Sequence, residues 1–487
     1  ISACLVGSEM CIRDRFLDHP CSPDILGINH YLTSERFLDE RLERYPIHQY
    51  GGNGRHTYAD VESVRVHAEG PAGFRLLLRE AAERYALPLA ITEAHLGCTR
   101  EEQLRWLLEA WQTAQDLRHE GIDMRAVTAW SLLGAFDWNK LVTVCAGFYE
   151  PGVFDVHGLY PRPTALAGLM RTLAAGREPD HPVFAVPGWW RRPERFFYPP
   201  VHAPLSDMKI GDAREGNGKV IRARPLLITG STGTLGKAFA RICEVRGIPY
   251  RLLSRQEMDI TDVRAVLSIL KELEPWSVVN AAGYVRVDDA ELNFKACEQA
   301  NVRGPAVLAA VCEQLHIGLL TFSSDLVFDG ERHLPYVETD ATGPLCVYGH
   351  TKVVAEKQVL SLCPSALVIR TSAFFGPWDS VNFVTMALNA LVARHPFRAA
   401  DDSVVSPTYV PDLVHSSLDL LIDGERGVWH LANDGAITWA GLARSAAELA
   451  SIDTSYLQSY PTEALGLPAR RPRYSVLGLS LIHISEP

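Results

Sequence analysis

The stretch RPLLITGSTGTLGKAFARI, residues 224–242, decides the fold of the C-terminal half of the chain. Its apolar run predicts a buried strand, its glycine-rich centre a tight turn, and its last part a helix. The spacing G-x-x-G-x-x-G lets a backbone turn sharply, approach a pyrophosphate and pack a helix closely on a strand. The N-terminus of such a helix attracts phosphate. We therefore expect a dinucleotide site, which includes Gly230, Gly233, Thr234, Leu235 and Gly236.

The strand that should follow this helix indicates which dinucleotide binds. An acidic residue at its end would hold the 2′-hydroxyl of NAD, whereas an arginine accommodates the 2′-phosphate of NADP. The strand YRLLS (250–254) ends in Ser254 and is followed by Arg255. This pattern predicts NADPH as the cofactor, with NADH as the alternative.

Composition places the 487-residue chain among ordinary globular proteins. It is 47% hydrophobic and 22% charged, which excludes a disordered or fibrous protein. A net charge of −11 argues against a nucleic-acid partner or an anionic membrane surface. No apolar run approaches the roughly 18 to 20 residues of a membrane span. The ten cysteines are scattered without a C-x-x-C pair, so we expect a reduced, cytoplasmic protein.

Strand–helix alternation divides the chain in two. The alternation runs over residues 16–176, breaks in a proline-rich linker over 177–223, and resumes over 224–478. It predicts a parallel sheet in each half. The two ends, 1–15 and 479–487, resemble translated sequencing-adapter read-through. We therefore leave both ends out of the fold and expect the natural protein to be longer on its N-terminal side.

A tyrosine and a lysine form the second motif of the C-terminal half. On a helix, the spacing in YGHTK (348–352) places Tyr348 and Lys352 on one face. A nearby ammonium favours the phenolate of a tyrosine, so the pair suits proton transfer to a carbonyl that receives a hydride. Upstream, LLTFSSDLVFDG (319–330) predicts a strand that ends in hydroxyls, among them that of Ser324. The sequence therefore predicts a catalytic set of Ser324, Tyr348 and Lys352.

Residues 225–478 resemble the extended short-chain dehydrogenase/reductases and, within them, the dTDP-4-dehydrorhamnose reductases. The resemblance covers essentially the whole C-terminal half. The segments that carry it are MDITD (258–262), VVNAAGYVRVDDAE (278–291), SSDLVFDG (323–330), PYVETD (335–340), YGHTK (348–352), VIRTSAFFG (368–376), NFV (382–384), SPTYVPDL (406–413) and RPRYSVL (471–477). It implies a Rossmann-type doubly wound parallel sheet with a small C-terminal substrate-binding subdomain.

The resemblance also implies roles for individual residues. Tyr348 would be the general acid, Lys352 would hold the nicotinamide ribose and tune Tyr348, and Ser324 stands in the place of a threonine. Besides Arg255, the residues that would line the cofactor are Asp259, Ile260, Ala281, Ala282, Gly283, Tyr348 and Lys352. The residues that would face the sugar nucleotide are Asn382, Ser406, Thr408 and Arg471. The implied reaction is NADPH-dependent reduction of the 4-keto group of a dTDP-linked 6-deoxy-hexulose, and a homodimer is compatible with it.

Three positions depart from the usual pattern of these reductases. Gly283 and Val285 stand where alanine and threonine are usual, and Leu326 stands where a tyrosine is usual. All three should lie near the substrate mouth. The departures therefore bear on which sugar is bound rather than on the chemistry.

No metal site is predicted. The 17 histidines contain no H-x-x-x-H or H-E-x-x-H pattern. Asp288, Asp289 and Glu291 are close in sequence, but acidic residues at the solvated start of a helix explain them better than a metal cluster does.

Residues 16–176 resemble the C-terminal portion of the family 1 glycoside hydrolases, the β-glucosidase group. The segments that carry this resemblance are ILGINHYLTSERF (25–37), LPLAITEAHLG (87–97) and AVTAWSLLGAFDWN (126–139). It implies part of a β/α (TIM-type) barrel, whose site lies at the C-terminal ends of the strands. The implied site residues are Glu93 as the nucleophile, with Asn29, Tyr31, Trp130, Asp137 and Trp138.

This part lacks half of a glycosidase site. A retaining glycosidase needs a second carboxylate about 5 to 5.5 Å from its nucleophile. In family 1 this acid belongs to an Asn-Glu-Pro sequence on an earlier strand, and the chain contains no Asn-Glu-Pro. We therefore expect no hydrolysis by the chain as it stands. Glu93 is then either a structural acid in a sugar-binding barrel or a nucleophile that acts only in a longer protein.

The leading interpretation is a nucleotide-sugar reductase fused to an incomplete glycosidase-like domain. Three alternatives stay open. The C-terminal half could bind NADP without turnover, or it could be an epimerase or dehydratase that recycles its cofactor. The full-length protein could also be a β-glycosidase. The complete set of Ser324, Tyr348 and Lys352 argues against the binding module, which has no need of all three.

Overall fold

The computed structural model describes residues 23–140, 143–158, 160–202 and 223–479. The segments predicted to derive from adapter sequence lie outside these residues, apart from Leu479. Part of the predicted linker, 203–222, also lies outside them.

Contacts divide the chain into two compact units. The first unit comprises Ile1–Leu96, Arg105–Ser131 and Trp190–Gly216. The second unit comprises Gly97–Leu104, Leu132–Trp189 and Asn217–Pro487. The boundaries predicted from the sequence, at 176 and 223, do not coincide with this division, because two segments of the N-terminal half pack with the C-terminal half. The extent of each family resemblance along the chain stays a prediction.

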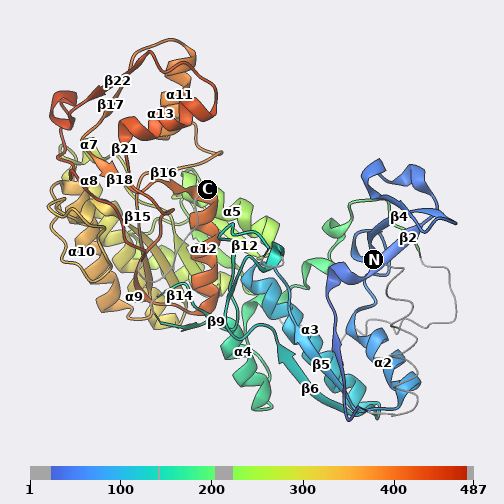
Figure 1. The fold of residues 1–487 in the computed structure, drawn as a ribbon. Helices are drawn as coiled ribbons and strands as arrows, with labels where there is room; N and C mark the ends of the chain where they lie inside the picture. The colour runs from blue at the N-terminus through green and yellow to red at the C-terminus, as the bar shows by residue number, and fades with distance from the viewer. Residues whose placement is uncertain (1–22, 141–142, 159, 203–222, 480–487) are drawn as a thin grey trace. The chain divides into compact units, whose positions relative to one another are not determined.

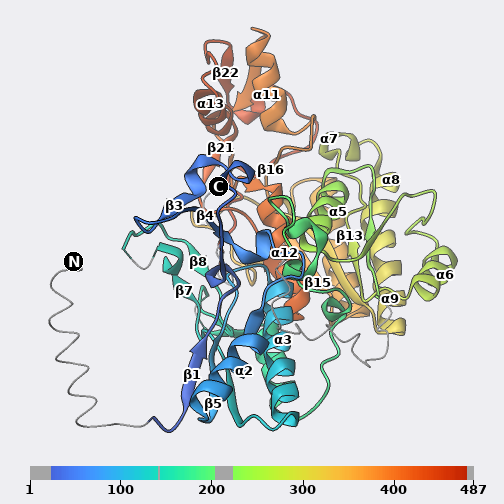
Figure 2. The same cartoon turned by 90° about the vertical axis from the view of Figure 1, so that its right-hand side faces the viewer.

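A parallel sheet forms the centre of the first unit (Figure 2). Its strand order is β1 (Leu26–Asn29), β5 (Leu89–Ala94) and β6 (Met124–Ala129). The two helices expected between the strands are present as α2 (Gly73–Tyr85) and α3 (Arg100–His119). Parallel strands joined through helices are the repeating element of a β/α barrel. The barrel itself stays a prediction.

Two features of the first unit add to this sheet. The first is an antiparallel sheet, whose strand order is β2 (Arg36–Asp39), β4 (Thr57–Glu62) and β3 (Tyr50–Gly52). The sequence pattern did not predict these strands. Trp190, from the predicted linker, packs edge-on against Trp106 at 5.1 Å between ring centroids. Both tryptophans are buried. The linker therefore packs in part on its neighbours, as the sequence predicts.

The apolar segment RAVTAWSLLGAF (125–136), which the sequence pattern predicts as one buried strand, is a parallel strand only in its first half. β6 ends at Ala129, and β7 (Ala135–Phe136) pairs antiparallel with β8 (Tyr149–Glu150) in the second unit. A Cβ atom at Gly134 would overlap the tyrosine ring that opens β8. The chain therefore approaches β8 closely here instead of continuing the parallel strand.

A six-stranded parallel sheet forms the core of the second unit (Figure 1). Its strand order is β12 (Tyr250–Leu253), β11 (Leu226–Thr229), β13 (Ser277–Asn280), β14 (Gly318–Ser324), β15 (Leu367–Thr371) and β20 (Gly427–His430). The chain builds outward from β11 in both directions, so the order reverses between β11 and β13. This confirms the doubly wound sheet, and such a reversal point is where these sheets bind ligands, at the carboxyl ends of the strands.

Helices cover both faces of this sheet (Figure 1). On one face, α9 (Gly304–Leu315) packs against α6 (Val263–Leu273) and α10 (Val347–Leu362). On the other face, α5 (Thr234–Arg246) packs against α12 (Val410–Asp423). Strand residues are buried throughout β11, β13 and β15 because both faces of each strand are covered.

A small subdomain stands at one end of the second unit, as expected (Figures 1 and 2). It contains α11 (Phe383–Val392) and α13 (Trp439–Leu449), which pack on each other. Its β17 (Phe397–Ala400) pairs in parallel with β22 (Leu457–Tyr460). Two shorter strand pairs complete the second unit. They are β16 (Phe374–Phe375) with β19 (Thr408–Tyr409), which are parallel, and β18 (Val404–Val405) with β21 (Ile437–Thr438), which are antiparallel.

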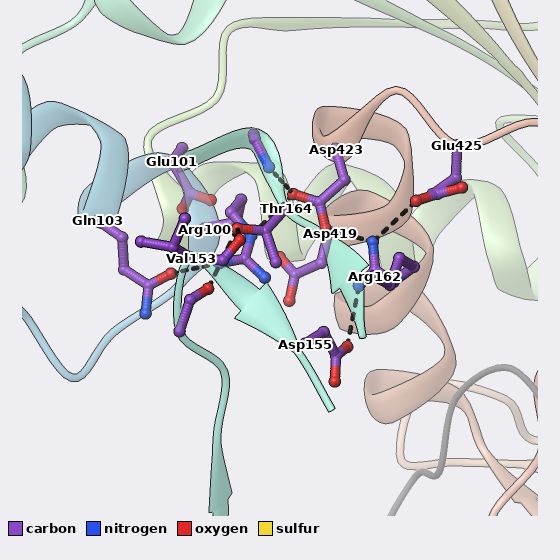
Figure 3. Close-up of polar contacts among 12 residues, drawn as sticks. Arg100, Glu101, Gln103, Val153, Asp155, Arg162, Thr164, Asp419, Asp423 and Glu425 are labelled. Carbon is purple, nitrogen blue, oxygen red and sulfur yellow. Dashed lines mark hydrogen bonds and ion pairs between the residues drawn. The ribbon is translucent and has the colours of Figure 1, made fainter. Parts of the chain in front are cut away.

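A buried ion-pair network attaches N-terminal segments to the α5–α12 face of the second unit (Figure 3). Asp423, at the end of α12, forms ion pairs with Arg100 at 2.9 Å and with Arg162 at 2.8 Å. Arg162 lies in β10 (Arg162–Pro163) and also pairs at 2.9 Å with Asp155 of β9 (Phe154–Asp155). Asp423 further accepts from the backbone N–H of Ala165, the first residue of α4 (Ala165–Ala174).

The innermost pair of this network joins Glu101 to Arg246. Both side chains are at most 1% exposed, and the Arg246 Nε lies 3.1 Å from each carboxylate oxygen of Glu101. Arg246 also donates to Asp419 at 2.6 Å. Burial acts to raise the pKa of Glu101, but the adjacent Arg246 charge outweighs it and the pKa is lowered. Glu101 is therefore an ionised carboxylate in the folded chain.

Replacing Glu101 by glutamine should strongly destabilise the second unit. The substitution leaves Arg246 paired with the partly exposed Asp419 but without its buried counter-charge, and breaking a buried ion pair costs about 3 to 5 kcal/mol. We expect Glu101→Gln to lower the free energy of unfolding by that amount in urea titrations of the full chain.

The exposed pair of Arg473 and Glu463 provides the control. Its atoms are 3.6 Å apart, and both side chains are mostly exposed. Glu463→Gln should change the free energy of unfolding by no more than about 0.5 kcal/mol. Equal effects of the two substitutions would show that the Glu101 pair does not stabilise this face.

Candidate active site

The glycine turn brings the start of α5 close to the ends of β11 and β13. Gly230 has a φ of +82°, and a Cβ atom there would lie 2.7 Å from the backbone oxygen of Ala281. A Cβ atom at Gly236 would overlap the carbonyl oxygen of Gly230. These two glycines therefore serve the tight turn and the close helix packing that the spacing predicts.

Gly233 differs from the other two glycines. The only nearby atom that a Cβ there would meet is the oxygen of Gly230, at 3.5 Å. Gly233 lies directly before α5, where backbone N–H groups have no partner within the helix. Thr234 opens the helix and donates to Asp379 at 2.6 Å, and Leu235 is half-buried beside it. This end of α5 is shaped for an anion, and the pyrophosphate contact of Gly233 stays a prediction.

Arg255 and Asp259 lie beyond the end of β12. Arg255 is 82% exposed and pairs with Asp259 at 3.2 Å. Hydrogen bonds from Thr261 lower the pKa of Asp259, and Arg255 adds to that effect. The Arg255 guanidinium is therefore positioned at the surface with its charge available to a phosphate. Ile260, by contrast, has its side chain in the core next to Gly304, so only its backbone could border an adenine.

The residues after β13 form a wall beside the glycine turn. The backbone N–H of Ala282 donates to Thr229 Oγ1 at 3.2 Å, which ties the end of β13 to the end of β11. A Cβ atom at Gly283 would lie 3.0 Å from Asn301 Oδ1 and 3.8 Å from Lys352 Nζ. The chain at Gly283 thus passes close to the predicted catalytic lysine.

The structure brings the predicted catalytic set together. Ser324 is the last residue of β14, and Tyr348 and Lys352 lie one turn apart on α10. Lys352 Nζ lies 5.6 Å from the centroid of the Tyr348 ring. It donates to the backbone oxygen of Phe322 at 3.1 Å, which anchors the lysine to β14. A strand end and a helix face therefore place the three polar groups at one edge of the sheet.

Burial shifts the pKa values of both Tyr348 and Lys352. Burial raises the pKa of Tyr348, and the nearby charge of Asp325 raises it further. Burial lowers the pKa of Lys352 to about 8. The expectation that the ammonium favours the phenolate is therefore outweighed by burial in the unliganded chain. Tyr348 is held as a protonated phenol, which is the form that a proton donor needs.

A cavity of about 590 Å³ opens beside Tyr348 and Ser324. It lies between the ends of β14 and β15 and the small subdomain. Its polar and aromatic lining includes Ser323, Ser324, Asp325, Tyr348, Ser372, Phe383, Arg398, Trp439, Arg471 and Ser475. Leu326 also lines it, where the reductase pattern has a tyrosine. The cavity joins the predicted catalytic groups to a chamber that can hold a small molecule.

Of the four residues expected to face the sugar nucleotide, Arg471 lines the cavity and the other three do not. Asn382 caps α11 by accepting from the Thr385 N–H at 3.0 Å. Ser406 accepts from the Leu477 N–H at 3.1 Å, and Thr408 is fully buried. These three side chains shape the subdomain from within, and a direct contact with substrate stays a prediction for them.

Arg471 is held by Asp288, one of the three acidic residues considered for a metal cluster. The two side chains form a double hydrogen bond at 2.7 and 2.8 Å. Asp288 lies in α7 (Val287–Ala290), in agreement with a helix start. Among the described residues, no group of three or more His, Cys, Asp or Glu side chains is arranged to hold a metal ion.

Sequence reasoning missed Asp325 and two of the serines around it, Ser372 and Ser475. Asp325 is buried and accepts hydrogen bonds from Ser324, Ser372 and Ser475. The signal was present, because all four residues lie within the quoted segments SSDLVFDG, VIRTSAFFG and RPRYSVL. Their proximity, however, depends on three chain segments meeting in space.

In the first unit, Glu93 accepts a hydrogen bond from Tyr31 and is half-buried. Asn29 accepts from Thr92 at 2.5 Å, and Trp130 packs on His95 at 4.7 Å between ring centroids. Contacts assign Asp137 and Trp138 to the second unit. Asp137 accepts from three backbone N–H groups of a turn, and Trp138 is 42% exposed. A glycosidase role for Glu93 stays a prediction.

Within the part of the chain that the structure describes, no helix combines the length and the apolar character needed to cross a membrane.

Burial of Lys352 predicts a pH-dependent stability. The ordinary pKa of 10.5 falls to about 8 in the fold, so the unfolded chain binds more protons between these values. The contribution of Lys352 to stability is therefore unfavourable below pH 8, by roughly 3 kcal/mol, and improves as the pH rises toward 10.5. In urea titrations without cofactor, Lys352→Met should remove this rise.

Lys357 on the same helix is the matched control because it is exposed. Lys357→Met should leave the pH dependence of unfolding as it is in the unaltered chain. If Lys352→Met also left it unchanged, the lysine would carry its charge at an ordinary pKa.

Similarity to known proteins indicates the family of this chain. The family model described as "RmlD substrate binding domain" matches residues 224–485. A dTDP-4-keto-6-deoxy-D-glucose reductase of Streptomyces niveus is 33% identical over 253 residues, which cover 52% of this chain and 88% of the relative. A dTDP-4-dehydrorhamnose reductase of Streptomyces griseus is 35% identical over 260 residues, which cover 52% of this chain and 85% of the relative.

A solved structure agrees with these relatives. The crystal structure of dTDP-4-dehydrorhamnose reductase from Bacillus anthracis, in complex with NADP, has a TM-score of 0.51 and 28% identity. The match covers 53% of this chain and 90% of that chain. Because the family model spans more than half of the chain and includes the glycine turn and the predicted catalytic set, the chain belongs to the RmlD family, that of the dTDP-4-dehydrorhamnose reductases.

Proposed function

We propose that the second unit reduces the 4-keto group of a dTDP-linked 6-deoxy-hexulose with NADPH. The observation that carries the proposal is the placement of Ser324 and Tyr348 in the lining of a cavity, with Lys352 Nζ 5.6 Å from the centroid of the Tyr348 ring. Relatives named for this reaction, and a structural neighbour named as an NADP complex, support it. Leu326 and the other departures leave the identity of the sugar open.

The residues present fit NADPH. Gly230 and Gly236 lack the Cβ atoms that would block the turn, and the start of α5 offers unpaired N–H groups to a diphosphate. Arg255 offers an exposed cation for the 2′-phosphate, and Lys352 would hold the nicotinamide ribose. When bound, NADPH supplies the hydride to the keto carbon.

Tyr348 is the group that donates the proton. Its raised pKa keeps the phenol protonated at neutral pH, so a proton is available to the keto oxygen as the carbon gains a hydride. The product is a hydroxyl group, and the phenolate left on Tyr348 regains a proton from solvent. Lys352, one turn away, stabilises that phenolate when it is charged.

Tyr348→Phe should abolish most of this activity. Removing a general acid typically lowers a rate by about 10² to 10⁴-fold. We expect NADPH oxidation with a dTDP-4-keto-6-deoxy sugar to fall by that factor in kcat, with the affinity for NADPH within about threefold. NADPH binding without turnover by the unaltered chain would favour the binding module. Interconversion of sugars without net NADPH consumption would favour an epimerase or dehydratase.

Arg255→Ala should change the cofactor preference. Loss of one phosphate contact costs about 1.4 kcal/mol, or tenfold in affinity. We expect the KM for NADPH to rise about tenfold while that for NADH stays unchanged. Arg264→Ala, an exposed arginine at the start of α6, should change neither value. Equal losses with both cofactors would rule out 2′-phosphate recognition by Arg255.

A homodimer and a cytoplasmic location are further parts of this proposal. The homodimer rests on the resemblance, and the location rests on the scattered cysteines. For the first unit, a β-glycosidase activity would require the missing second carboxylate. We propose a sugar-binding role for Glu93 and Tyr31, which incubation with β-glucosides and a binding measurement would test.

A further inference from the structure

Asp325 is a carboxyl group enclosed by hydroxyls. It is 6% exposed and lies between the end of β14 and the cavity. The hydroxyl of Ser324 donates to its Oδ1 at 2.9 Å. Its Oδ2 accepts from Ser372 at 2.9 Å and from Ser475 at 2.6 Å. Among the described residues, Asp325 has no ion pair with a lysine or arginine. Burial raises the pKa of Asp325, and the hydrogen bonds from the three serines act to lower it.

The contact with Asp325 uses the one proton of Ser324. A serine hydroxyl has a single donor and two lone pairs. The proton points to Asp325, and one lone pair accepts from the Leu326 N–H at 3.2 Å. The remaining lone pair is the only hydrogen-bonding capacity left for the cavity. In this arrangement Ser324 can accept from a neighbour, but it cannot donate to a keto oxygen.

We propose that Asp325 is a positioning residue for the reduction. By holding the Ser324 proton, it fixes the serine as an acceptor on the cavity side and leaves Tyr348 as the proton donor to the keto oxygen. This inference rests on the proposed reductase function. Burial raises the pKa of Tyr348 and the nearby Asp325 raises it further, whereas the hydrogen bond with Ser324 acts to lower it.

The environment of Asp325 predicts what an amide would do in its place. Two hydroxyls donate to Oδ2 and one to Oδ1, so the oxygen of an asparagine should take the Oδ2 position. Its NH₂ group would then face Ser324 and donate to it. This reverses the hydrogen bond and turns the Ser324 proton toward the cavity, where it competes with the proton of Tyr348. Asp325→Asn therefore changes a proton position with little change in volume.

The test is a double-mutant cycle in the full chain with Asp325→Asn and Ser324→Ala. NADPH oxidation with a dTDP-4-keto-6-deoxy sugar and urea unfolding are measured for each variant. We expect Asp325→Asn to lower kcat at least tenfold, with KM within threefold. In the Ser324→Ala background the same substitution should have almost no further effect on kcat, because no hydroxyl is left to orient.

Asp329→Asn is the matched control. It lies four residues further along, does not line the cavity, and accepts from Tyr336 at 2.7 Å. Asp329→Asn should change kcat less than twofold. A larger loss would show that any Asp→Asn change in this segment lowers kcat, whether or not it touches Ser324.

Each other outcome overturns a stated part of the inference. Additive effects on kcat would show that Asp325 acts independently of Ser324, and additive effects on unfolding would show that the two side chains do not interact. If unfolding shows coupling but the unaltered chain does not oxidise NADPH with any 4-keto sugar nucleotide, the proposed function fails. The positioning role then fails with it, although the hydrogen bond remains.

Discussion

Everything in the second unit depends on the parallel register of its central strands. Ser277 of β13 lies opposite Gly318 of β14, and Ser324 at the end of β14 lies opposite Thr371 at the end of β15. Parallel strands in this register end at one edge of the sheet, so the residues that follow them meet there. The glycine turn, the wall after β13 and the Asp325 cluster are all such residues. A slip of one residue would turn these side chains to the opposite face.

Local pattern sufficed to predict the parts of the site that lie within one element. The four-residue spacing of Tyr348 and Lys352 fixes their common face on a helix, and the glycine spacing fixes the turn before α5. Both follow from the geometry of a single strand, turn or helix. The resemblance then identified the family, which the family model confirms over residues 224–485.

What the sequence could not show depends on segments that meet only in the folded chain. Ser475 is 150 residues from Asp325, and no periodicity links the two. Burial of Tyr348 likewise outweighs the effect expected of Lys352 on its pKa, since desolvation depends on the whole surrounding packing. Asn382, Ser406 and Thr408 lie in segments typical of these reductases, yet they cap or fill the subdomain. A motif locates a segment, but only the packing decides which of its side chains reach the cavity.

The ion pairs on the α5–α12 face have a consequence for how this polypeptide can change over time. Glu101 and Arg100 precede the linker by many residues, but their partners, Arg246 and Asp423, belong to the reductase fold. A substitution at one member of a pair leaves a buried charge that a matching change in its partner would remove. The two halves are thus bound to evolve together at these positions. Recombination that exchanged one half for a homologue would have to carry residues 97–104 and 132–189 along with the reductase.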